Sequence, residues 1–230
     1  MKQLITLTAF LSFLICFTQT NEVDSLTIQL AYQKQDSSKV KTSVQLIKAL
    51  YQNKDFKKAI LYIDQTENLS KQLGYTKGIA DANYYKALIY TQKDDYFNAI
   101  DSYNKARSHY IDLNDVLGVA QVNNSIGLIE IRRGNYVTGL KLSLSSIKIF
   151  EERNLPKELS KVYNNLAEAY FNTNEIDKSL EFNLKALTVR EQLRDSSGII
   201  SSTKNIAHLY SKRREHRKAI EYYETLLSFI

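Results

Sequence analysis

The sequence has 230 residues, of which 43% are hydrophobic and 24% charged, and its formal net charge is +6 at pH 7. These proportions are typical of an ordered globular chain and exclude a disordered polypeptide. A single Pro and only seven Gly favour helices, because both residue types interrupt them. The positive excess is a mild bias that agrees with solubility or with an acidic partner, and it does not indicate nucleic acid as a partner.

The first twenty residues, MKQLITLTAFLSFLICFTQT, differ from the rest of the chain. Lys2 is their only charge, and the apolar run that follows is shorter than the about 20 residues that a membrane-spanning helix needs. The pattern predicts a secretory signal peptide over residues 1–20, cleaved after Thr20. We therefore expect an exported protein, periplasmic or extracellular, with no stable membrane span after cleavage. A lipoprotein modified at Cys16 and an uncleaved anchor are the alternatives, although Ile15 is larger than the residue that usually precedes a lipidated cysteine.

Residues 21–37 precede the regular part of the chain. The segment SLTIQLAYQKQDSSK, which begins at Ser25, predicts a single helix that packs as a cap on the structure that follows.

From residue 38 onward a pattern recurs every forty residues. Gly78, Gly118 and Gly198 follow polar loops at matching places, and Glu158 takes the same place in the unit between them. Five units are predicted, at residues 38–77, 78–117, 118–157, 158–197 and 198–230. Within each unit, apolar residues at helical spacing form two helices with a polar turn between them.

Small residues occupy fixed places in both helices of a unit. The first-helix column is Ala87, Gly127, Ala167 and Ala207, and the second-helix column is Ala59, Ala99, Gly139, Ser179 and Ala219. Small side chains let the two backbones approach closely, and the larger residues beside them fill the groove toward the next hairpin. One hairpin cannot bury its apolar face alone, whereas stacked hairpins can. The sequence therefore predicts an all-α solenoid of about five helix hairpins.

This pattern, together with NNSIG at 123–127 and NNLA at 164–167, resembles the tetratricopeptide repeat family. The usual repeat has about 34 residues, and a repeat of forty resembles the long-repeat subclass found in kinesin light chain and in mitotic adaptors that bind G-protein subunits. The resemblance covers residues 38–230, is looser in the first unit, and implies a right-handed α-solenoid in an exported bacterial protein. HEAT-like repeats have periods near forty and are the alternative fold.

No catalytic or metal-binding motif occurs in the sequence. The three histidines, His109, His208 and His216, fall in different units without metal-ligand spacing, and His216 takes the place of an aromatic residue in its column. No glycine-rich phosphate-binding loop is present. We therefore expect no enzyme activity, no catalytic residue, no cofactor and no metal.

The resemblance implies where a ligand binds. In long-repeat relatives, asparagines on the first helix of each unit hold the backbone of an extended peptide, and an amide suits this role because it both donates and accepts. The candidate protein- or peptide-binding residues share the inner face of the first helices: Tyr84, Leu88, Asn124, Leu128, Asn164, Asn165, Glu168, Lys204, Asn205 and His208. The alternative is that some of these asparagines tie neighbouring helices together.

The function expected from these features is that of a protein- or peptide-binding scaffold or adaptor. The alternative is an exported sensory region of a bacterial signalling protein, of histidine kinase or transcriptional regulator type, without its output domain. The basic run KRREHRK at 212–218 is either a solvated turn or a docking patch for an acidic partner or anionic lipid. The last helix ends in the apolar sequence EYYETLLSFI, so we expect a second copy, as a homodimer, or further sequence to cover this edge.

Overall fold

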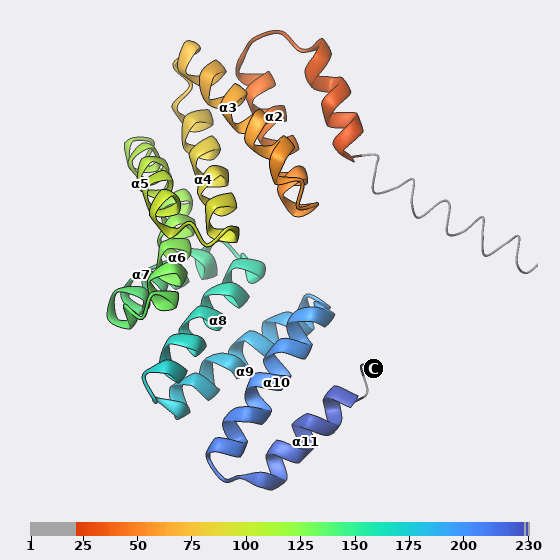
Figure 1. Ribbon diagram of the computed structural model, residues 1–230, viewed down its shortest axis with the longest axis vertical. Coiled ribbons are helices and arrows are strands. Elements are labelled where there is room, and N and C mark those ends of the chain that lie inside the picture. The colour runs from red at the N-terminus through yellow and green to blue at the C-terminus, as the bar shows by residue number, and fades with distance from the viewer. Residues whose placement is uncertain (1–21, 228, 230) are drawn as a thin grey trace, which may run out of the picture. The chain divides into compact units, whose positions relative to one another are not determined.

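The computed structural model describes residues 22–227 and 229, and all regular structure in that part of the chain is helical (Figure 1). An N-terminal helix at residues 22–32 precedes α2 (Ser37–Gln52), α3 (Phe56–Gln72), α4 (Thr76–Gln92), α5 (Tyr96–Asp112), α6 (Val116–Arg132), α7 (Tyr136–Glu152), α8 (Pro156–Asn172), α9 (Ile176–Gln192), α10 (Ser196–Lys212) and α11 (His216–Leu227). The predicted signal peptide and Cys16 lie outside the described residues. The predicted all-α class and the succession of helical hairpins are confirmed.

From α3 onward a helix begins every twenty residues, and the repeat of forty is one pair of such helices. Every turn between these helices contains one residue with positive φ, which ends the preceding helix. These residues are Lys54, Gly74, Asp94, Asn114, Gly134, Asn154, Asn174, Arg194 and Arg214. After α8, for example, the N–H of Glu175 donates to the carbonyl of Tyr170 at 2.8 Å, which closes the turn. The polar loops read from the sequence are these helix ends.

The glycines that mark the repeat lie inside helices and not in the loops. Gly78 and Gly198 are the third residues of α4 and α10. A Cβ on Gly78 would lie 2.5 Å from a methyl carbon of Val40, and a Cβ on Gly198 would lie 2.7 Å from Cδ of Arg190. Glycine is required there because the first turn of each helix passes close to side chains of other helices.

The chain forms two compact units, one ending at Asn114 and one beginning at Asp115. In the first unit, successive helices from α2 to α5 pack on one another. Its core contains Leu46, Ile47 and Leu50 of α2 with Ile63 of α3. Leu30 of the N-terminal helix belongs to the same cluster and is only 7% exposed, so that helix packs on the first hairpin.

In the second unit, α6 to α11 pack in sequence, and the small residues allow the close crossings. Gly127 in α6 and Gly139 in α7 meet so closely that a Cβ on Gly139 would lie 2.8 Å from the carbonyl oxygen of Gly127. In the next hairpin, the hydroxyl of Ser179 donates to the carbonyl of Ala167 at 2.8 Å. The small-residue columns therefore mark where the two helices of a hairpin touch.

Candidate functional site

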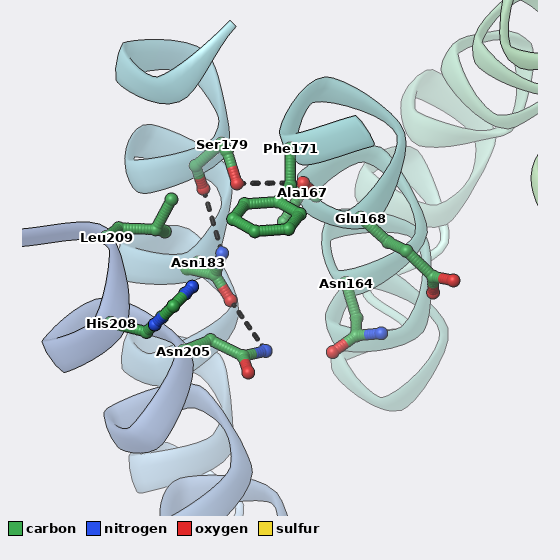
Figure 2. Close-up of a pocket in the computed structure, with 9 residues that line it drawn as sticks. All are labelled: Asn164, Ala167, Glu168, Phe171, Ser179, Asn183, Asn205, His208 and Leu209. Atoms are coloured by element: carbon green, nitrogen blue, oxygen red, sulfur yellow. Dashed lines mark hydrogen bonds between the residues drawn. The ribbon is translucent and has the colours of Figure 1, made fainter. Parts of the chain in front are cut away.

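A pocket of about 390 Å³ lies in the second unit, where side chains of α8, α9 and α10 meet (Figure 2). We call it the amide pocket. Its lining residues are Asn164, Ala167, Glu168, Phe171, Ser179, Asn183, Asn205, His208 and Leu209.

Helical spacing brings these residues together. The four residues from α8 lie at i, i+3, i+4 and i+7, and the three from α10 at i, i+3 and i+4, so each set covers one face of its helix. α8 and α10 are the first helices of successive hairpins, and α9 packs against both. Ala167 and Ser179 line the pocket at the place where α8 and α9 touch.

A chain of hydrogen bonds fixes two of the amides. Nδ2 of Asn183 donates to the backbone carbonyl of Ser179 at 2.9 Å, and Oδ1 of Asn183 accepts from Nδ2 of Asn205 at 3.3 Å. Asn183 is only 3% exposed, whereas Asn205 lies at the surface. Figure 2 shows both bonds: the first lies within α9, and the second crosses from α10 to α9. The buried amide thus holds the exposed one in place.

The third amide is held by Arg190 of α9. The Nη2 atom of Arg190 donates to Oδ1 of Asn164 at 3.3 Å. The Nη1 atom of Arg190 donates to the hydroxyl of Ser202 at 2.5 Å and to the backbone carbonyl of Gly198 at 3.2 Å. Burial lowers the pKa of the Arg190 guanidinium, and the negative charge of Asp195 opposes this. An arginine side chain stays protonated in proteins, so Arg190 is a fixed positive charge behind the pocket.

The remaining surface of the pocket is apolar and aromatic. The Phe171 ring stands at the centre of Figure 2, and its centroid is 5.7 Å from that of the His208 ring. Nζ of Lys212 lies 4.6 Å from the centroid of Phe171, which is a cation–π contact. Leu209 contributes to the core behind the ring and is 1% exposed. The pocket therefore offers an apolar surface framed by amides.

The structure brings four of the predicted site residues into this pocket: Asn164, Glu168, Asn205 and His208. Lys204 is exposed on α10 but does not line the pocket. Tyr84 and Leu88 lie half-buried on α4 in the first unit, and the Tyr84 ring packs against Tyr85 and Tyr103. Leu128 is half-buried on α6.

Asn124 and Asn165 have a different environment. They are 6% and 5% exposed, and Nδ2 of Asn165 donates to Oδ1 of Asn124 at 2.9 Å. This bond joins α6 to α8, the first helices of two hairpins. For this pair the geometry supports the alternative reading, in which asparagines tie neighbouring helices.

The sequence analysis did not identify Asn183 or Arg190 as site residues, although each differs in type from the residues at the equivalent positions of the other repeats. Arg190 stands where the other units have Ser70, Tyr110 and Phe150, which are at most 2% exposed. A charge in a column of buried residues is a signal that packing alone does not explain. Asn183 stands in the column of Ile63, Tyr103 and Ser143 and gives a weaker signal of the same kind.

The basic run at 212–218 is largely paired with carboxylates. Arg213 lies 3.0 Å from Asp177 and 2.7 Å from Glu215, and Lys218 lies 2.8 Å from Glu215. Neighbouring acidic groups therefore offset much of its charge, which favours the solvated turn. Among the described residues, no cluster of three metal-ligating side chains occurs. In the same part of the chain, every helix is too short or too polar to cross a membrane.

Comparisons with protein families and with solved structures agree with the array of helical hairpins described above. Residues 158–229 match the tetratricopeptide repeat model, and no curated protein sequence matches the chain. BtubC (BKLC) from P. vanneervenii has a TM-score of 0.72 at 17% identity, with 92% of this chain and 87% of that chain covered. Aspartyl phosphate phosphatase F from Bacillus subtilis has a TM-score of 0.67 at 16% identity, with 92% and 68% covered.

A third similar structure is the signal transduction ATPase with a tetratricopeptide repeat sensor from Pyrococcus horikoshii. Its TM-score is 0.71 at 17% identity, with 89% of this chain and 32% of that chain covered. At such identities these structures share the fold. The family model covers residues 158–229, and the structural similarity shows that the chain has the fold of tetratricopeptide-like repeat solenoids, with equivalent helices forty residues apart.

Proposed function

We propose that the protein is a non-enzymatic scaffold or adaptor that binds an extended segment of a partner protein in the amide pocket. The observation that carries this proposal is the presence of fixed side-chain amides and an apolar surface in one pocket. The tetratricopeptide fold supports a role in protein interaction in general. The pocket supports a specific place for it.

The pocket suits an extended peptide for two reasons. The backbone N–H and C=O groups of an extended chain are unpaired, and Asn164 and Asn205 present amide groups that complement them. The partly exposed ring of Phe171 offers an apolar surface to a side chain of the peptide. The volume of about 390 Å³ lies at the small end of the range of about 300–1,000 Å³ for ligand pockets, which leaves room for a short segment.

The charges around the pocket favour a peptide with an acidic residue. Lys204 and Lys212 lie at i and i+8 on α10, on the side of the helix that also carries His208, and Arg190 lies behind Asn164. Glu168 is the one carboxylate among the nine lining residues. We therefore expect an acidic side chain in the ligand on the α10 side and an apolar one over Phe171.

The test uses a degenerate library of capped nine-residue peptides passed over the immobilised full chain, followed by fluorescence anisotropy with the recovered peptides. His208→Trp places a large ring at the mouth of the pocket and should weaken binding by about tenfold or more, which corresponds to about 1.4 kcal/mol. The matched control is Thr188→Trp, on the exposed surface of α9 outside the pocket, and it should bind as the wild type does. A library from which the wild type retains no peptide, or equal weakening by both variants, would contradict the proposal.

A sensory region of a bacterial signalling protein is the second candidate, and the similarity to a structure described as carrying a tetratricopeptide repeat sensor favours it. Hydrogen exchange distinguishes the two. A scaffold gains protection only in α8, α9 and α10 when the peptide binds. A sensor also changes exchange in helices that do not line the pocket.

We also propose that the chain is exported and that residues 1–20 are removed, on the strength of Lys2 and the apolar run that follows it. N-terminal sequencing of protein recovered from a cell envelope fraction should then begin near Asn21. A mature chain that begins at a lipidated Cys16 or at Met1 would contradict this proposal.

A further inference from the structure

Arg190 takes the place of a buried ring in the equivalent position of two other repeats. The equivalent residues Tyr110 and Phe150 fill their places with rings that are 2% or less exposed. Arg190 is half-buried, its Nε has no hydrogen-bond partner in the described part of the chain, and no carboxylate there lies within ion-pair distance of it. Burying a guanidinium without a paired carboxylate costs free energy. Its hydrogen bonds to Asn164, Ser202 and Gly198 are therefore the contacts that distinguish it from a ring at this position.

The bond from Arg190 determines how Asn164 is oriented. A guanidinium only donates hydrogen bonds, so the group of Asn164 that faces Arg190 must be the side-chain oxygen. The amide nitrogen of Asn164 donates to no described residue and keeps both of its N–H groups. A ligand that reaches Asn164 therefore meets hydrogen-bond donors.

The orientation of Asn205 is fixed by a similar argument. The backbone carbonyl of Ser179 only accepts, so it binds the nitrogen of Asn183, and the oxygen of Asn183 must then accept from Asn205. Asn205 commits one N–H to this bond and keeps its other N–H and its side-chain oxygen for a ligand. Neither amide can rotate by 180° without losing its bond, because the groups that hold them cannot exchange donor for acceptor.

We infer that Arg190 is a positioning residue that gives the two exposed amides of the pocket a fixed polarity, with N–H donors at Asn164 on α8 and an unengaged side-chain oxygen at Asn205 on α10. The ligand accordingly presents a carbonyl or carboxylate oxygen to Asn164 and an N–H to Asn205. A peptide backbone group meets both requirements in one direction only, so the pocket selects the direction in which the bound chain runs. This inference rests on the proposed binding of a peptide in the same pocket.

The decisive variant is Asn164→Asp in the full chain. It keeps an oxygen for Arg190 and replaces the N–H groups with a second oxygen. A nine-residue peptide recovered by the wild type should bind at least about tenfold more weakly, while the new ion pair with Arg190 raises Tm by about 2 °C or more. Asn172→Asp is the matched control, because it makes the same exchange at an exposed residue of α8 outside the pocket, and it should change the affinity less than about twofold.

A second readout needs no ligand. The rise in Tm caused by Asn164→Asp should vanish when Arg190 is also changed to Met, and the side-chain N–H signals of Asn164 in a ¹⁵N spectrum should shift in the Arg190→Met single variant. If Asn164→Asp binds the peptide as well as the wild type, or gains the same stability without Arg190, the inference is wrong even though peptide binding stands. If the wild type retains no peptide, the proposed function fails, and the Tm comparison still decides whether Arg190 orients Asn164.

Discussion

Asn165 of α8 donates a hydrogen bond to the side-chain oxygen of Asn124 in α6 at 2.9 Å, and the two residues are 5% and 6% exposed. Loss of one partner leaves a buried polar group unsatisfied, which costs about 1–3 kcal/mol. We predict that Asn165→Ala lowers Tm by several degrees, since about 1 kcal/mol corresponds to about 2–4 °C for a chain of this size. Peptide affinity should stay within about twofold of the wild type.

Asn205→Ala is the matched comparison, because Asn205 is exposed and lines the pocket. It should weaken peptide binding and leave Tm nearly unchanged. Thermal unfolding and anisotropy measured on both variants check the pair of predictions. The opposite assignment, with Asn165→Ala losing affinity at unchanged Tm, would show that the buried pair contacts the ligand.

The crossing of α6 and α7 depends on the absence of side chains at two positions. A Cβ on Gly139 would lie 2.5 Å from Cγ1 of Ile131 and 2.8 Å from the carbonyl oxygen of Gly127. Overpacking of this kind costs about 1–3 kcal/mol, so Gly139→Ala should lower the midpoint of urea unfolding even though alanine favours helices. Thr138→Ala, at the exposed neighbouring position, is the control and should be close to neutral. Equal stability of the two variants would show that the helices move apart without penalty.

The turns offer a stabilising change. Arg194 has φ of 53°, in the left-handed region where a side chain is unfavourable and glycine is not. Arg194→Gly should therefore raise the free energy of unfolding by about 0.5–1 kcal/mol, despite the added freedom of glycine in the unfolded chain. Arg194→Ala keeps the Cβ and should give no gain, so a gain in both variants would assign the effect to the lost arginine charge.

The sequence was sufficient for the fold because the fold repeats. Each column samples the same environment several times, so the small residues at Ala167, Ser179 and Gly139 stand out as positions where helices touch. The pattern also grouped Asn164, Glu168, Asn205 and His208, which line the amide pocket from α8 and α10; their role in binding stays a prediction.

The columns could not distinguish an amide that faces a ligand from one that faces another helix. Asn164 and Asn165 are adjacent in the sequence, yet a step of one residue turns a helix by about 100° and buries the second side chain between α8 and α6. Asn183 and Arg190 lie on the second helix of the hairpin, whereas the candidate site residues were chosen from the first helices alone. Their hydrogen bonds depend on packing across three helices, which no single column records.

Self-association through α11 remains a prediction. Ile220, Tyr223 and Leu227 lie on one face of this helix and are 55%, 43% and 69% exposed. Leu180 occupies the register of Ile220 one repeat earlier and is only 6% exposed, because α10 covers it. The face that is covered by a helix in one hairpin is thus exposed in the next. Burying one of its large apolar side chains fully would contribute about 1.5–3 kcal/mol.

We predict that a second copy covers this face. Arg217 and Lys218 lie in the first turn of α11, and Glu221 and Glu224 lie farther along it, so two antiparallel copies bring opposite charges together. Sedimentation of residues 21–230 at micromolar concentration should show a dimer, and Ile220→Glu should convert it to a folded monomer. A wild type that is monomeric and does not aggregate would contradict the prediction.

Hydrogen–deuterium exchange of the full chain, with and without a peptide recovered from the degenerate library, tests the central claim most directly. The account predicts that the peptide slows exchange in residues 164–171 of α8 and 205–209 of α10 and leaves the helices of the first unit unchanged. The same peptide should give no protection in the His208→Trp variant. Protection confined to α2–α5, or to the exposed face of α11, would place the binding site elsewhere and contradict the assignment of the amide pocket.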